Sequence, residues 1–229
     1  MTTCFIRKLL FILGLFSLTA ANSQENFTGY FQPQISLNYK VATNYSHSFA
    51  LSLRNYVYET EELQLGTRQL DIAHFSKLKI NNGQSLAFGV LYRFRTNFES
   101  DEENELRLTQ QYNITHKPRI GRFVHRLRAE QRINPSLTTH RFRYQFAIAL
   151  PLNGQLLDLG EPYFTISTEA LLSVANKKNP QYDQRITVNI GWLVSEMAKL
   201  QGGIEYRVED YTRQNEHVLF LLTSLIFKL

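Results

Sequence analysis

The sequence predicts an all-β protein, an antiparallel up-and-down transmembrane β-barrel of about 10–12 strands. Three observations lead to this prediction. Apolar and polar residues alternate in many short segments, several of the polar faces carry arginine at every second position, and no apolar stretch after residue 23 is long enough for a membrane helix. Because successive side chains of a strand point to opposite faces, each such segment has one apolar face and one charged face.

The alternation is clearest in residues 105–150. In the last of its three segments, Phe142, Tyr144 and Phe146 share one parity, while Arg141 and Arg143 occupy the other. A soluble sheet would bury the apolar face and leave the charged face in water. We expect the reverse here, with arginine-rich faces turned inward and apolar faces in contact with lipid. The alternative is a soluble sandwich of two sheets with the phenyl rings between them.

Composition agrees with one barrel domain. The chain has 229 residues and a net charge of +5 at pH 7, which falls to about +3 without residues 1–23. Its mean hydropathy is slightly negative, which excludes a bundle of membrane helices but not a barrel, because half of each membrane strand is polar. The basic residues stand singly rather than in a patch, so nucleic acid is not an expected partner. The single cysteine, Cys4, allows no disulfide in the mature chain.

Residues 1–23 read as a secretory signal peptide, which leaves 24–229 for the barrel. Arg7 and Lys8 form a basic head, and residues 9–18 form an apolar run too short to span a bilayer. Ala21 and Ser23 fit the small residues that precede cleavage before Gln24, and cleavage after Ala21 fits as well. The alternative is an N-terminal membrane anchor.

Eleven alternating segments follow along the chain. They cover residues 28–39, 45–58, 69–80, 86–94, 105–114, 123–133, 141–150, 164–172, 183–192, 200–208 and 217–229. Single-chain bacterial barrels usually have an even number of strands. We therefore expect that the first segment lies outside the barrel or that a long loop contains a further strand.

The breaks between the segments predict two kinds of connection. Asn81-Asn82-Gly83 predicts a tight hairpin turn, since Asn and Gly accept positive φ. Short turns near residues 81, 118 and 195 alternate with longer polar loops near 61, 101, 176 and 210. This alternation favours short periplasmic turns and longer outer loops. The last segment is apolar, contains Phe227 and ends at the C-terminus, which resembles the signal read by the barrel assembly machinery during biogenesis.

A series of short motifs carries a resemblance to a known family. They are Glu105-x-Arg107-x-x-Gln110-Gln111, Arg126-x-Arg128-x-Glu130-Gln131-Arg132, Arg141-x-Arg143-Tyr144, Pro151-Leu152, Glu169, Tyr182-Asp183-Gln184-Arg185 and Asn215-Glu216-His217. In this order they resemble the bacterial family of domain of unknown function 2490, predicted outer-membrane barrels common in Bacteroidota. Tyr30 or Phe31 stands where that family often has Trp, and Asp183-Gln184-Arg185 replaces a more usual Asn-Arg pair. The resemblance implies the cell outer membrane and a barrel, but no activity.

The charged faces contain the only conspicuous cluster of functional groups. We expect these residues to form a lumenal charge network: Arg54, Arg93, Arg95, Glu105, Arg107, Arg126, Arg128, Glu130, Arg132, Arg141, Arg143, Glu169, Asp183, Arg185, Glu205 and Arg207. The first interpretation is a ladder of ion pairs that fills a narrow lumen, because the planar guanidinium bridges carboxylates on neighbouring strands. The second is an anion-selective pore or an anionic-ligand site, since arginine outnumbers acid.

An enzyme is not expected, and we assign no catalytic residue, metal ligand or cofactor. The residues of a lipid-modifying hydrolase would be His116, His125 or His140 with Ser136 or Ser167. However, no glycine-flanked nucleophile elbow and no HExxH motif occurs. His125 shares the parity of Phe123, which places it toward lipid or the membrane interface. The acidic run 101–103 could hold a divalent cation, although a solvated loop is the ordinary expectation.

We therefore expect an integral outer-membrane barrel with a structural role or a role in the transport of small solutes or anions. The alternatives are a closed barrel that serves as subunit or scaffold of an envelope complex, and an outer-membrane hydrolase. The expected partners are outer-membrane lipid, the barrel assembly machinery and, as an open question, another envelope protein.

Overall fold

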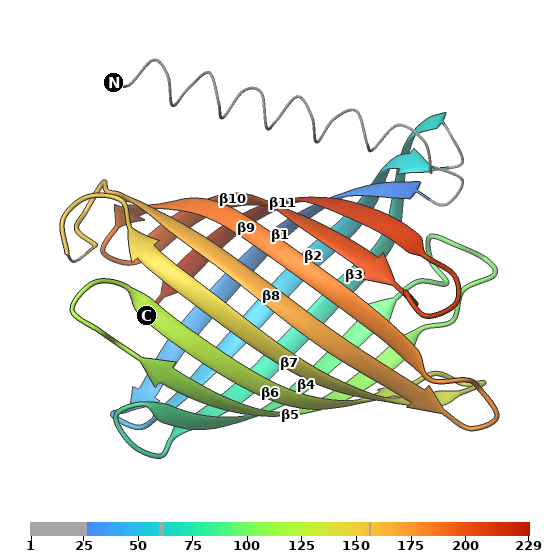
Figure 1. Ribbon diagram of the computed structural model, residues 1–229, viewed down its shortest axis with the longest axis horizontal. Coiled ribbons are helices and arrows are strands. Elements are labelled where there is room, and N and C mark those ends of the chain that lie inside the picture. The colour runs from blue at the N-terminus through green and yellow to red at the C-terminus, as the bar shows by residue number, and fades with distance from the viewer. Residues whose placement is uncertain (1–26, 60–61, 156) are drawn as a thin grey trace.

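The computed structural model describes residues 27–59, 62–155 and 157–229, and these residues form one closed β-barrel (Figure 1). The proposed signal peptide, residues 1–23, lies outside the described residues. The strands are β1 (Phe27–Ala42), β2 (Tyr45–Glu59), β3 (Glu62–Lys79), β4 (Gln84–Phe94), β5 (Glu105–His116), β6 (Arg122–Ile133), β7 (Thr138–Pro151), β8 (Pro162–Ala175), β9 (Gln181–Ser195), β10 (Ala198–Glu209) and β11 (Glu216–Lys228). The all-β barrel of ten to twelve strands is thus confirmed.

The barrel closes through a parallel pair of strands. All other neighbours are antiparallel, but β1 and β11 run in the same direction, from the pair Phe27↔His217 to the pair Asn38↔Lys228. The expectation of an even strand number is therefore wrong: the first segment belongs to the barrel, and the described loops contain no further strand. An odd number is possible because a parallel pair also satisfies the backbone groups of both strands and leaves no open edge.

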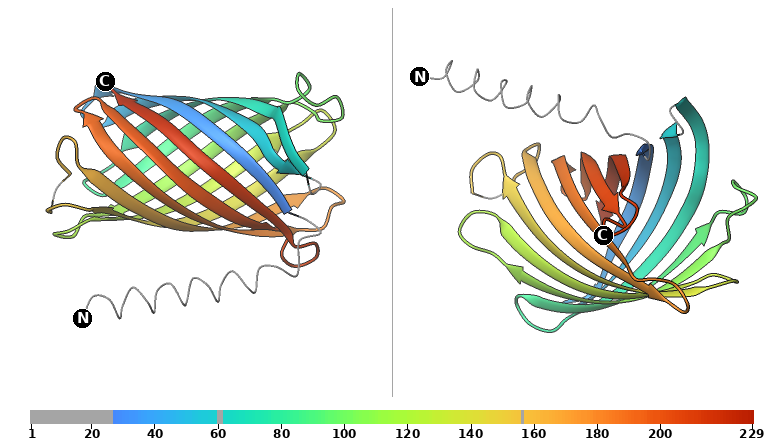
Figure 2. Two further views of the ribbon diagram at one scale, coloured as in Figure 1. Left: turned by 90° about the horizontal axis from the view of Figure 1, so that it is seen from above. Right: turned by 45° about the vertical axis from the view of Figure 1, so that its right-hand side comes forward.

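The two ends of the barrel carry different connections (Figure 2). We call the end where β11 finishes the C-terminal end. It carries the turns at 43–44, 80–83, 117–121 and 196–197. The opposite end carries the loops at 95–104, 134–137, 176–180 and 210–215. The predicted separation of turns from loops has two exceptions among the described connections: the long connection between β7 and β8 lies at the C-terminal end, and the short connection at 134–137 lies at the opposite end.

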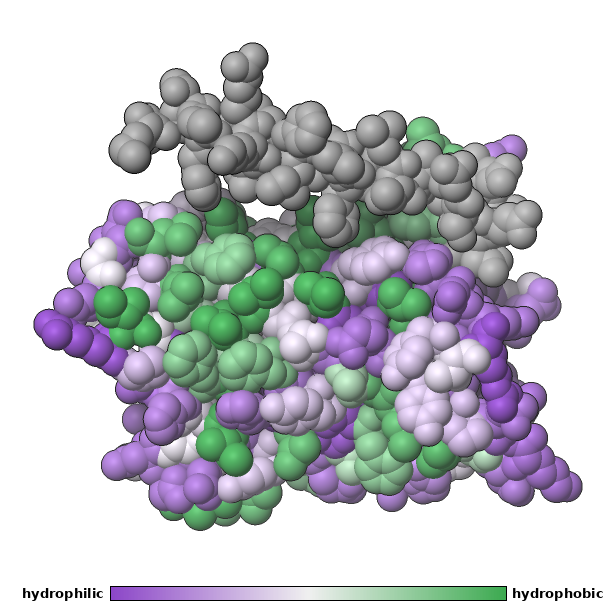
Figure 3. Space-filling view, in the orientation of Figure 1, coloured by the Kyte–Doolittle hydropathy of each residue, from purple (hydrophilic) through white to green (hydrophobic). Residues whose placement is uncertain are grey.

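The wall of the barrel is apolar outside and charged inside. On β4, the outward Phe88 is 49% exposed, whereas the inward Arg93 on the same strand is only 5% exposed. Inward Glu105 on β5 is 2% exposed. In the space-filling view, apolar side chains gather on the middle of the wall and hydrophilic ones toward both ends (Figure 3). The soluble sandwich with phenyl rings between two sheets is therefore not the fold.

No helix in the described part of the chain is both long enough and apolar enough to cross a membrane.

Two aromatic rings lie flat against glycines on the inner wall. Phe75 on β3 is paired with Gly89 on β4, and Tyr163 on β8 is paired with Gly191 on β9. A Cβ atom at Gly89 would lie 2.3 Å from the Phe75 ring, and one at Gly191 would lie 2.5 Å from Tyr163. Because the glycines have no side chain, the rings occupy space that any other residue would fill.

Candidate functional site in the lumen

The sixteen residues of the predicted lumenal network all face inward, where each makes a polar contact with another inward side chain. Fifteen of them come from β2 and from β4 to β10, and Arg95 directly follows the end of β4 at Phe94. The strands place them together because the charged parity of each segment points into the closed barrel. Arg54 and Arg126 are the least connected members, since the one side-chain hydrogen bond of each goes to an uncharged residue at 3.2 Å, Gln32 for Arg54 and Asn113 for Arg126.

Glu105 is the most heavily paired carboxylate of the lumen. It accepts hydrogen bonds from Arg107 and Arg132, with the Arg132 guanidinium at 2.6 Å, and the Arg93 guanidinium lies 3.8 Å away. Arg93 in turn forms a bidentate pair with Asp71 at 2.7 and 2.8 Å. The planar fork of arginine allows this bridging between β3, β4, β5 and β6.

A second group of charges lies across β6 to β10. Arg143 joins two carboxylates, Glu130 at 3.0 Å and Glu169 at 2.6 Å. Arg185 lies between Glu169, Asp183 and Glu209 at longer distances of 3.8–4.0 Å. The network therefore contains both tight pairs and an arginine held by several distant carboxylates.

Several inward residues are absent from the predicted set. Asp71 and Glu209 pair with network arginines, and the sequence shows both on the charged parity of their segments, Glu209 two positions after Arg207. Tyr30, Tyr56 and Phe220 form a buried aromatic cluster in the lumen. The sequence conceals Phe220 because β11 is apolar on both parities, so the alternation gives no signal there.

The aromatic cluster is surrounded by guanidinium groups. The Arg207 guanidinium carbon lies 3.8 Å from the centre of the Phe220 ring, and that of Arg54 lies 4.8 Å from it. Arg68 lies 5.5 Å from the Tyr30 ring and also donates a hydrogen bond to the Tyr30 hydroxyl. The face of an aromatic ring attracts a guanidinium group. Several arginines can therefore lie close together here without a separate carboxylate for each of them.

The loop between β4 and β5 is tied to the mouth opposite the C-terminal end. Glu102 pairs with Arg95 at 2.9 Å and with Arg68 at 3.1 Å. Glu99 accepts a hydrogen bond from Tyr56, and the Asn104 side chain accepts one from the Arg95 backbone N–H at 2.7 Å. The acidic run at 101–103 thus contributes a carboxylate to protein ion pairs and is not a purely solvated loop.

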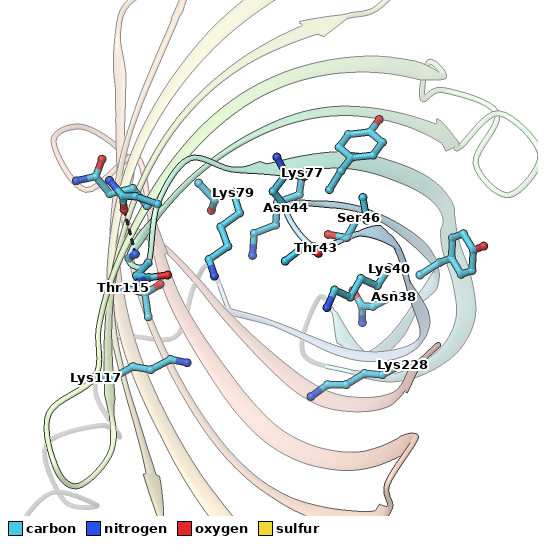
Figure 4. Close-up of a pocket in the computed structure, with 18 of the residues that line it drawn as sticks. Asn38, Lys40, Thr43, Asn44, Ser46, Lys77, Lys79, Thr115, Lys117 and Lys228 are labelled. Atoms are coloured by element: carbon cyan, nitrogen blue, oxygen red, sulfur yellow. Dashed lines mark hydrogen bonds between the residues drawn. The ribbon is translucent and has the colours of Figure 1, made fainter.

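Two separate cavities occupy the lumen. The first has a volume of about 520 Å³ and is lined by ten arginines and four acidic residues. The arginines are Arg54, Arg68, Arg93, Arg95, Arg107, Arg132, Arg141, Arg143, Arg185 and Arg207. The second cavity, of about 490 Å³, opens at the C-terminal end and is lined by five lysines and Arg122 (Figure 4). The two linings have no residue in common.

A layer of side chains separates these cavities. On β6, Arg122 lines the C-terminal cavity and Arg132 lines the arginine cavity, so Arg126 and Arg128 lie between them. The Arg128 guanidinium carbon lies 5.7 Å from the centre of the Phe75 ring. Phe75 belongs to β3, three strands away in the barrel, so this contact reaches across the lumen. The Phe75–Arg128 contact therefore narrows the lumen between the two cavities.

The residues considered for hydrolase chemistry are not brought together. His125 points outward and is hydrogen-bonded to the Tyr144 hydroxyl at 2.9 Å. Ser136 donates to Glu103 at 2.6 Å, while Ser167 accepts a 3.4 Å hydrogen bond from Gln145. His116 and His140 are exposed near the ends of their strands. Among the described residues, no group of three or more His, Cys, Asp or Glu side chains is placed to hold a metal ion.

Comparison with known proteins gives one result on the family. A family model described as "Protein of unknown function (DUF2490)" matches residues 33–218, which include most of β1 and all of β2 to β10. A comparison with curated proteins finds no match.

Proposed function

The chain belongs to the DUF2490 family, whose description assigns no activity, and from the geometry of the barrel we propose that it is an integral outer-membrane protein with a narrow lumen that passes small anions. The observation that carries the proposal is the sidedness of the wall, with charged residues buried in the lumen and large apolar residues exposed outside. A protein that exposes so much apolar surface in water would aggregate, whereas a bilayer covers that surface.

The height of the apolar surface supports a membrane location. On β9, the outward residues Ile186, Val188, Ile190, Trp192 and Val194 are all exposed. These eight residue steps rise about 27 Å along the strand, which a tilt of about 40° projects to about 21 Å of barrel height. Membrane barrels carry an apolar band of about 25 Å, so the surface fits the hydrocarbon core of a bilayer.

The charges of the lumen support anions as the permeating species. Ten arginines line the inner cavity, and the cavity at the C-terminal end is lined by six cationic residues without any Asp or Glu. In the layer between them, Arg126 donates a hydrogen bond to Asn113 at 3.2 Å but belongs to none of the ion pairs of the described residues. Charged side chains that line a pore select the oppositely charged ion, so this surplus favours anions.

The proposal is tested by the conductance of the purified barrel in planar lipid bilayers. We expect small conductance steps, because the Phe75–Arg128 contact narrows the lumen, and a reversal potential that indicates preference for chloride over potassium. Arg126→Gln removes a cation from the constriction without leaving a carboxylate unpaired. It should therefore lower the ratio of anion to cation permeability by about twofold or more.

Arg119→Gln is the matched control, since Arg119 lies in the exposed turn between β5 and β6. It should leave the permeability ratio unchanged. A folded, membrane-inserted barrel with no conductance would contradict the passage of anions, and an equal effect of both substitutions would contradict selection at the constriction.

A sealed barrel that acts as subunit or scaffold of an envelope complex is the second candidate. It is favoured by the separation of the two cavities and by the Phe75–Arg128 contact across the lumen. This candidate predicts that no conductance is measured and that one envelope protein is recovered in fixed ratio after crosslinking in intact cells. Recovery of the barrel without a crosslinked partner would contradict this candidate.

A further inference from the structure

The charged side chains that line the cavity at the C-terminal end are all cationic. They belong to Lys40, Lys77, Lys79, Lys117, Arg122 and Lys228. These residues come from β1, β3, β6, β11 and the turn between β5 and β6, so they line the side of the opening that runs from β11 through β1 to β6. In the close-up, Lys40, Lys79, Lys117 and Lys228 extend toward the open centre (Figure 4).

Among the residues that the structure describes, these six cations form no ion pair with an Asp or Glu side chain. The lining contains no Asp or Glu, and none of the six takes part in the ion pairs found among the described residues. This is a sharp contrast with the arginines of the network, most of which pair with carboxylates. Like charges that line one cavity raise its positive potential and attract anions from solution.

The uncharged polar residues of the lining indicate which groups the ligand carries besides its negative charge. Asn38, Asn44, Ser46 and Thr115 lie among the lysines, and further Asn, Gln, Ser and Thr side chains complete the wall. Such groups donate and accept hydrogen bonds and suit hydroxyl groups of a solute. A volume of about 490 Å³ lies within the range of small-molecule sites.

The charge of the site favours phosphate over a single carboxylate. A phosphate monoester carries about −1.5 to −2 charges at pH 7 and three acceptor oxygens, so one group contacts several lysines at once. Lysine binds phosphate as a point charge and needs no fixed planar geometry. The exposed, flexible lysines of this cavity therefore fit a phosphate group better than a planar carboxylate.

We propose that the cavity at the C-terminal end is a binding site for small soluble phosphate esters that carry hydroxyl groups, such as sugar phosphates. The charged residues of the lining belong to the inward faces and turns of the barrel, so the ligand enters from solution and not from the acyl-chain region. The inference deepens the proposed anion passage, on which it rests for the direction of entry; the binding itself is a separate property.

The test is calorimetric titration of the full barrel, solubilised in a detergent without phosphate, with glucose 6-phosphate at low ionic strength. We expect saturable binding that weakens steeply with salt, and no binding of glucose. The double variant K79Q/K228Q should weaken binding about tenfold or more, because each lysine–phosphate contact near 4 Å contributes about a fivefold factor even at the dielectric constant of water.

The control K177Q/K178Q makes the same change of charge in the exposed loop between β8 and β9, at the opposite end. It should retain the wild-type affinity within about twofold. If K79Q/K228Q does not fold, K40Q/K117Q removes two other charges of the lining and carries the same expectation. Absence of saturable binding, binding unaffected by the lining substitutions, or equal weakening in the control would each overturn the proposal.

The outcome is separable from that of the conductance experiment. Binding by a barrel that does not conduct contradicts the anion passage and supports this site. Conductance without binding of the phosphate ester supports the anion passage and contradicts this site.

Discussion

Glu105 shows how one residue holds several strands of the lumen. Its carboxylate contacts guanidinium groups from β4, β5 and β6, and the side chain is almost entirely excluded from solvent. Three arginines so close together repel one another unless a negative charge lies between them. The stability of this part of the barrel therefore depends on the charge of Glu105 more than on its size.

Glu105→Gln should lower the free energy of unfolding by about 3 kcal/mol or more, because it keeps the shape of the side chain but leaves buried arginines without compensation. Unfolding in denaturant from lipid vesicles can be followed by the fluorescence of Trp192, the single tryptophan of the chain. Glu196→Gln, in the exposed turn between β9 and β10, is the matched control and should change stability little. Equal stability of both variants would show that Glu105 is not central to the network.

The predicted network residues illustrate what alternation reveals at this scale. Parity alone placed Arg107, Glu130 and Arg143 on inward faces, since a closed barrel turns one parity of every strand inward. It could not assign partners, because pairing depends on the register between strands. For the same reason the contact of Arg68 with Glu102, which lies 34 positions further along the chain, could not be predicted.

At the scale of elements, glycines and aromatic rings on neighbouring strands fit each other. Phe75 covers Gly89, and Tyr163 covers Gly191, in directly paired positions. Each pair fills the inner wall with a flat ring where two ordinary side chains would collide. The register between β3 and β4 is therefore fixed by shape as well as by backbone hydrogen bonds.

Gly89→Ala should destabilise the barrel by about 1–3 kcal/mol, because its new methyl group would overlap the Phe75 ring. Shortening the ring in the double variant G89A/F75L should recover part of this loss relative to F75L alone, measured by the same denaturant unfolding. Gly66→Ala is the control, since a Cβ atom there meets no atom within 4 Å. If Gly89→Ala were no more harmful than Gly66→Ala, the proposed fit between ring and glycine would be wrong.

The strand boundaries were predictable except where the alternation breaks. The segment beginning at residue 69 is in fact a longer strand, β3, that begins at Glu62. Residues 62–69 extend past Leu70↔Phe94, the last pair with β4, and the register with β2 shifts between Arg54 and Asn55 and again between Tyr56 and Tyr58. Such irregularities change which parity faces inward, so a fixed period of two does not follow the chain through them.

At the scale of the whole molecule, the parallel pairing of β1 with β11 could not be predicted from the sequence. Alternation reports which side chains share a face, but not the direction of the neighbouring strand. Eleven segments were visible, yet the usual even number argued for ten or twelve. The parallel pair resolves this difference, since strands that begin at the same end of the barrel can close it only in parallel.

The orientation of the wall connects the fold to the proposed function. If the apolar face contacts lipid, the lysine-lined and arginine-lined cavities form the interior of a membrane protein and face its aqueous compartments. If it does not, neither the passage of anions nor entry of a phosphate ester through the C-terminal end has a membrane to act across. The contact between the outer wall and lipid is therefore the first property to measure.

The most direct measurement is a scan of nitroxide spin labels, placed one at a time at residues 85–93 of β4, with the barrel in lipid vesicles. Collision with oxygen dissolved in the bilayer should be high at Leu86, Phe88, Val90 and Tyr92, which face outward, and low at the inward positions between them. Collision rates with no period of two, or with the maxima at Ala87 and Arg93, would contradict a barrel whose apolar face lies in lipid.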